Sequence, residues 1–122
     1  MTDALEHIQK ISEKIRPVVQ LLAYRADISP KLEPGDFEKF WGATFSSVSR
    51  WELFMKVMVL PYADVVLNYE TVQPNEEGLY RFPVEIPMIT LPLVDKETFT
   101  ILNKAMKFYL NLYNLVQRSR SK

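Results

Sequence analysis

The sequence KETFTILNKAMKFYLNLYNLVQR, residues 96–118, is the stretch that most constrains the fold. It follows Asp95, and on a helix its apolar residues would leave only a narrow polar stripe. That stripe consists of Thr100, Asn103, Lys104, Lys107, Asn111, Asn114 and Arg118. A helix that is apolar over so much of its surface must be covered on most sides.

Two arrangements can cover this helix in a chain of 122 residues. In a homodimer, the helix would pack on its own domain and on a second copy, and its interface residues would be Phe108, Tyr109, Leu112, Tyr113 and Val116. In a monomer, the helix would lie at the centre, wrapped by the rest of the chain. We expect the homodimer, because so small a domain has few elements with which to surround the helix.

Residues 3–25 predict a second long helix. Its apolar residues recur at alternating spacings of four and three, as in a heptad seam: Ala4, Ile8, Ile11, Ile15, Val18 and Leu22. Pro17 lies inside this pattern and lacks the amide that would bond to the carbonyl of Glu13. Because the seam continues past the proline, we expect one helix kinked at Pro17 rather than two helices.

Residues 37–59 predict a third helix, which starts after Asp36 and ends before Pro61. Its large apolar residues, many of them aromatic, cover more than one face. Gly42 and Ser46 are small residues at helical spacing, which would let another backbone approach closely.

Residues 63–72 and 79–86 alternate between apolar and polar side chains, the pattern of half-buried strands. The segment between them, QPNEEG at residues 73–78, is rich in turn-forming residues. The sequence therefore predicts a β-hairpin between the second and third helices along the chain. The expected fold is α+β and predominantly helical, a single domain over residues 1–122 with a short basic tail at 118–122.

The charges balance at 15 basic and 15 acidic residues, but they are unevenly distributed. Residues 62–97 hold two basic and seven acidic residues, a net charge of −5, whereas residues 98–122 hold five basic and no acidic residues, a net charge of +5. The two blocks can neutralise each other, or each can meet an oppositely charged partner. The acidic candidates for a partner surface are Glu70, Glu76, Glu77 and Glu85.

Few residues in the chain are suited to catalysis. There is no cysteine, and the one histidine, His7, is expected on the surface of the first helix. With three glycines, the chain has no phosphate-binding loop motif. Glu70 and Glu85 on opposite hairpin arms form the one carboxylate pair worth considering, and no cleft is evident around them. We expect no catalytic residue, no metal site and no cofactor.

The remaining expectation is a non-enzymatic protein–protein interaction module whose partner is another protein. It could be an adaptor, an inhibitor or immunity protein, a chaperone-like protein or a complex subunit. The alternative is a nucleic-acid-binding accessory protein that uses the basic end of the chain: Lys104, Lys107, Arg118, Arg120 and Lys122. The acidic residues near the N-terminus and the lack of a long apolar run favour a cytoplasmic protein without a membrane span.

Overall fold

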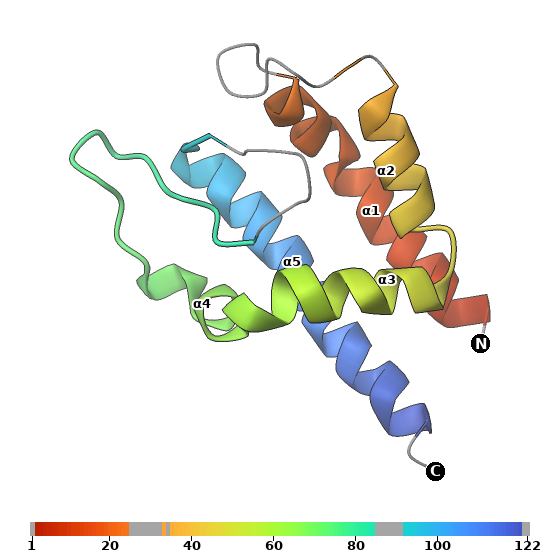
Figure 1. The fold of residues 1–122 in the computed structure, drawn as a ribbon. Helices are drawn as coiled ribbons and strands as arrows, with labels where there is room; N and C mark the ends of the chain where they lie inside the picture. Colours follow the sequence, from red (N-terminus) through yellow and green to blue (C-terminus); the bar gives the residue numbers. More distant parts are fainter. Residues whose placement is uncertain (1, 25–32, 34, 85–91, 121–122) are drawn as a thin grey trace.

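The structure is a computed structural model that describes residues 2–24, 33, 35–84 and 92–120 (Figure 1). Two long helices, α1 (Thr2–Ala23) and α5 (Lys96–Arg120), run antiparallel and pack on each other. The helix expected at residues 96–118 is thus confirmed as α5. Helix α1 continues through Pro17 without a break, because the core contacts of its seam extend on both sides of the proline.

The single helix expected at residues 37–59 is wrong, because the chain breaks after Thr44 into α2 (Asp36–Thr44) and α3 (Val48–Phe54). Two serines make the break. The Ser46 hydroxyl donates to the carbonyl of Ala43 at 2.9 Å, and the extended Ser47 accepts from the amide of Arg50 at 3.2 Å. Such local bonds compete with a continuous helix and begin a new one.

Beyond α3 the helix widens and then ends near Pro61. Residues Met55–Val59 form a π-helical turn, in which the amide of Leu60 donates to the carbonyl of Met55, and Leu60–Tyr62 form a 3₁₀ turn. Pro61 has no amide hydrogen and its ring crowds the preceding turn, and here, unlike at Pro17 in α1, the regular helix gives way to the 3₁₀ turn. The chain therefore changes direction here and leads into α4 (Ala63–Leu67).

The expected hairpin is also wrong. Residues 63–72 form α4 and a 3₁₀ turn at Tyr69–Thr71, and the described ranges contain no β-strand. The β-structure within them is one isolated antiparallel bridge between Tyr80 and Val94, whose amides donate to each other's carbonyls at 2.7 and 2.8 Å. The fold of the described residues is therefore helical, not α+β.

Residues 63–69 form helical turns and not a strand because of which of their side chains are buried. Val66 and Tyr69, three residues apart, are buried, whereas Val65 and Leu67 remain substantially exposed. This is helical spacing, selected by the packing of α4 on α5. Nearby, Phe99 at the start of α5 stacks on Tyr80 with ring centroids 4.5 Å apart, which anchors the bridge segment to the helices.

The main core is aromatic and centres on Trp51 of α3. Its fully buried ring lies 5.9 Å from that of Tyr109 and 6.0 Å from that of Tyr113, both on α5. Gly42 on α2, in contrast, is exposed, and nothing lies within 4 Å of where a Cβ would stand. The close helix approach expected at Gly42 and Ser46 is therefore absent from the described part of the chain.

Candidate functional site

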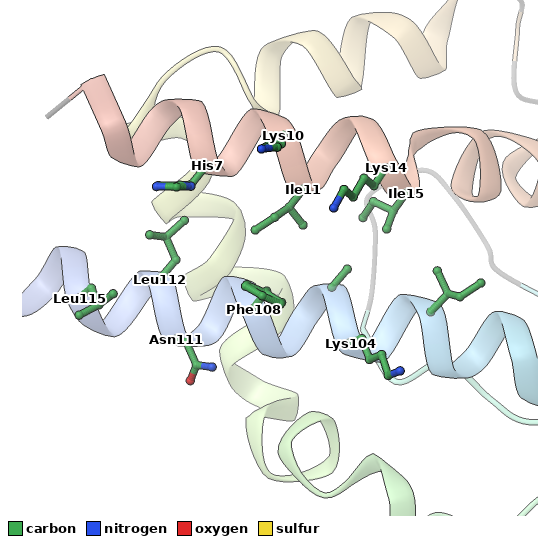
Figure 2. Close-up of a pocket in the computed structure, with 12 residues that line it drawn as sticks. His7, Lys10, Ile11, Lys14, Ile15, Lys104, Phe108, Asn111, Leu112 and Leu115 are labelled. Carbon is green, nitrogen blue, oxygen red and sulfur yellow. The ribbon is translucent and has the colours of Figure 1, made fainter.

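An open groove with a volume of about 640 Å³ runs between α1 and α5 (Figure 2). Both helices contribute its lining residues: His7, Lys10, Ile11, Lys14, Ile15, Ile101, Lys104, Ala105, Phe108, Asn111, Leu112 and Leu115. Because α1 and α5 are antiparallel, the His7 end of α1 lies beside the Leu115 end of α5. The Ile15 end of α1 lies beside the Lys104 end of α5.

The α5 wall of the groove carries a row of exposed apolar side chains. Ile101, Phe108 and Leu115 are 41%, 65% and 58% exposed, and they follow one another at intervals of seven residues. Lys104 and Asn111 stand between them at the intermediate positions of the same face. Large apolar residues that are exposed singly need no explanation, whereas a row of them along one groove makes that groove a candidate binding surface.

The α1 wall has the same mixture of apolar and basic side chains. His7, Ile11 and Lys14 share one face at spacings of four and three, and Lys10 lies alongside them. Ile11 is half-buried at the groove wall, and Ile15 is buried as part of the core.

A buried polar link joins the two helices. The hydroxyl oxygens of Ser12 on α1 and Tyr109 on α5 lie 2.5 Å apart, and Ser12 donates its own hydrogen to the carbonyl of Ile8 at 2.6 Å. Tyr109 must therefore be the donor to Ser12. Burial raises the pKa of Tyr109 well above its ordinary value, because the charged phenolate would lose its hydration. The phenol is therefore neutral and fixes the position of α1 against α5.

The charge of the groove is one-sided. Lys10, Lys14 and Lys104 line it together with His7, and no carboxylate is among the lining residues that the structure describes. The lysines are exposed, so their ammonium groups lie beside an apolar surface. The arrangement favours a ligand that combines apolar groups with negative charge.

A second, smaller depression of about 250 Å³ lies where α2 meets α3 and the π-helical turn. Among its lining residues are Phe40, Met58 and the two exposed side chains Leu53 and Val57. It is less than half the volume of the groove between α1 and α5, and Arg50 is the one charged residue among its described lining residues.

Of the five residues expected at a dimer interface, three lie toward the outside of α5 and two face the core. Phe108 and Leu112 line the groove, and Val116 is partly buried against the core. Tyr109 and Tyr113 face inward and pack on Trp51. An external surface on α5 therefore consists of Phe108 with Ile101 and Leu115, two residues that the expected interface left out. Their seven-residue spacing was the signal that could have found them.

None of the expected acidic residues is among the described residues that line the groove, but Glu70 lines a neighbouring depression of about 530 Å³ together with Lys104. Glu70 is exposed on the 3₁₀ turn, and Glu76 and Glu77 are exposed in the loop that follows. Glu85 lies outside the described residues. The carboxylate pair of Glu70 and Glu85 was expected on opposite hairpin arms, an arrangement that the helical fold of residues 63–72 removes.

The expected basic residues are dispersed along α5. Lys104 lines the groove, Lys107 is half-buried, Arg118 is exposed, and Lys122 lies outside the described residues. Arg120 pairs with Glu52, a residue of α3 that the sequence pattern did not single out.

Glu52 is a buried carboxylate held by the end of α5. Nη1 of Arg120 lies 2.7 Å from its Oε1 and donates to its Oε2 at 2.9 Å, and the amide of Gln117 donates to Oε2 at 2.5 Å. A carboxylate with only 5% of its surface exposed requires such partners. The bonds fasten the last turn of α5 to α3, so the basic end of the chain is partly engaged within the protein.

Among the described residues, no cluster of three or more histidine, aspartate or glutamate side chains is placed to hold a metal ion. The helices of this part of the chain also fall short of the combination of length and hydrophobicity that a membrane span needs. Comparison of the chain with protein families, with curated proteins and with solved structures found no match.

Proposed function

We propose that this protein is a non-enzymatic protein–protein interaction module, and that the groove between α1 and α5 receives an apolar segment of its partner. The observation that carries the proposal is the row formed by Ile101, Phe108 and Leu115, whose side chains are 41–65% exposed along one wall of the groove. Burying such side chains against a partner is favourable by about 25 cal/mol for each Å² of apolar surface removed from water.

Phe108 is the expected anchor of this interaction. Among the described residues it is the one aromatic side chain that is largely exposed, at 65%, and it stands midway between Ile101 and Leu115. Central aromatic residues at the edge of apolar pockets carry a large share of the binding energy in protein interfaces. Two neighbouring features support a fixed groove: the buried link from Ser12 to Tyr109 and the buried Ile15.

The nucleic-acid alternative has less support. Arg120 is engaged with Glu52, and the lysines of the groove alternate with large apolar side chains rather than forming a continuous basic stripe. The cytoplasmic location expected from the sequence stays a prediction.

Selection of binding peptides from a displayed library tests the proposed function and does not require the natural partner. Peptides selected against the wild-type protein should lose affinity about 30-fold or more with Phe108→Asp, the loss expected at a binding hot spot. The matched control is Leu53→Asp, since Leu53 is 55% exposed but lies on α3, away from the groove. Binders that tolerate Phe108→Asp and fail on Leu53→Asp would contradict the proposal.

A further inference from the structure

The two walls of the groove have the same periodicity, that of helices that pack side by side. On α5, Ile101, Lys104 and Phe108 continue to Asn111 and Leu115 at alternating spacings of three and four. On α1, His7, Ile11 and Lys14 follow the same rule. Alternating spacings of three and four characterise the seam along which one helix packs on another. A third helix laid in the groove would meet one such seam on each side.

The length of the groove also suits a helix. Its lining residues on α5 extend from Ile101 to Leu115, which corresponds to about 21 Å at the rise of an α-helix. An occupant of about four helical turns would therefore contact the whole exposed row. A helix satisfies its own backbone hydrogen bonds, so it can lie on an apolar wall that offers few polar partners.

The charge of the groove determines the chemistry of the occupant. Lys10, Lys14 and Lys104 stand beside the apolar row, and the described lining residues include no carboxylate, although Glu70 lines a neighbouring depression together with Lys104. A second copy that met this face by two-fold symmetry would bring three lysines of each copy together, which is unfavourable. The exposed carboxylates Glu70, Glu76 and Glu77 stand on a 3₁₀ turn and a loop, so they do not provide a second copy with an acidic helix.

We infer that the occupant of the groove is an acidic amphipathic helix of a partner protein, with an apolar seam that meets Ile101, Phe108 and Leu115 and with glutamate or aspartate residues that meet Lys10, Lys14 and Lys104. This inference rests on the proposed function and adds the conformation and charge of the partner segment. The apolar seam supplies affinity, and the carboxylates supply selectivity and a faster association rate.

Three synthetic helical peptides of about 20 residues test the inference directly. The first carries leucines at spacings of three and four with flanking glutamates, the second has lysine in place of every glutamate, and the third keeps the glutamates but has glutamine in place of every leucine. Fluorescence anisotropy should show the first peptide binding about tenfold or more tightly than either of the others at about 0.05 M salt. The advantage over the lysine peptide should shrink at about 0.5 M salt, because salt screens exposed charges.

Charge reversal in the protein provides the decisive comparison. The triple variant Lys10→Glu, Lys14→Glu, Lys104→Glu should prefer the lysine peptide. The control variant Lys39→Glu, Lys56→Glu, Arg81→Glu makes the same change in net charge at exposed residues outside the groove and should keep the wild-type preference. The control separates attraction by the groove from attraction by the whole molecule.

Each other outcome overturns the inference in a recognisable way. If the glutamate and lysine peptides bind equally well and Phe108→Asp abolishes the binding of both, the inference that the occupant is acidic is wrong. The proposed function would still stand. A dimer in sedimentation velocity that disappears with Phe108→Asp would place a second copy in the groove. Failure of all three peptides would overturn the helical occupant, and the library selection would then decide the fate of the proposed function separately.

Discussion

The hydroxyl groups of Ser12 and Tyr109 lie 2.5 Å apart in the buried contact between α1 and α5, the two helices that form the groove. The two residues are 97 positions apart in the sequence. Because the Ser12 hydroxyl donates to the carbonyl of Ile8, the Tyr109 hydroxyl is the donor in its bond with Ser12. This bond sets how α1 lies against α5.

A double-mutant cycle measures this link. Tyr109→Phe should cost about 1 kcal/mol of unfolding free energy, whereas Ser12→Ala should cost about 2 kcal/mol, because it leaves a buried hydroxyl without a partner. The double variant should be less unstable than the sum of the two single losses. Urea unfolding of the four proteins provides the values, and strict additivity would show that the two hydroxyls do not interact.

The raised pKa of Tyr109 predicts how stability depends on pH. The phenol has an ordinary pKa of 10.0, which it recovers when the chain unfolds, and the folded protein keeps it neutral to higher pH. The stability it contributes is therefore fully present below about pH 10 and is lost as the pH rises from there through the folded pKa. Urea unfolding between about pH 9 and pH 11 should show a steeper loss for the wild type than for Tyr109→Phe. Parallel losses in the two proteins would contradict this account.

The contact between Glu52 and the end of α5 predicts a selective effect of Arg120. Arg120→Ala removes the cation that faces a buried carboxylate and should cost about 1–2 kcal/mol, a figure reduced because the arginine is half exposed. Arg118→Ala, at an exposed position two residues earlier on α5, should change stability by less than about 0.5 kcal/mol. Thermal unfolding compares the two, and equal effects would mean that the Glu52 contact contributes nothing.

The start of α3 depends on one side chain. Ser47→Ala removes the acceptor for the amide of Arg50 and should destabilise the protein by about 1 kcal/mol. Ser49→Ala is the matched control, since Ser49 is exposed inside α3, where alanine is the better helix former. It should leave stability unchanged or slightly raised. A larger loss from Ser49→Ala than from Ser47→Ala would contradict the assigned helix start.

The long helices were predictable because their patterns extend over many turns. Residues 96–118 and the seam through Ile8 and Ile15 each repeat often enough to exclude other periods. Residues 63–69 hold too few side chains for that. Val65, Leu67 and Tyr69 alternate as in a strand, yet Val66 and Tyr69 also fit a helix face, and the packing of α4 on α5 selects the second pattern. Local sequence alone cannot make that choice.

The groove was only partly predictable for a related reason. The excess of apolar residues on α5 was clear from the sequence and predicted a helix covered on most sides, by a second copy or by its own domain. Which ones remain exposed depends on the rotation of α5 against Trp51, which turns Tyr109 and Tyr113 inward and leaves Phe108 outside. The lysines of the two walls come from segments about 90 residues apart in the chain, so only the fold brings Lys14 and Lys104 to one groove.

The most direct test of the central claim, that the groove between α1 and α5 binds an acidic amphipathic helix, is methyl NMR during titration with the glutamate peptide. Binding in the groove should shift the methyl resonances of Ile11, Ile101 and Leu115 and should give intermolecular contacts from the peptide leucines to these methyl groups. The methyl groups of Leu53 and Val57, which line the smaller depression, should not move. Shifts confined to Leu53 and Val57, or binding without contacts to Ile101 and Leu115, would contradict the claim.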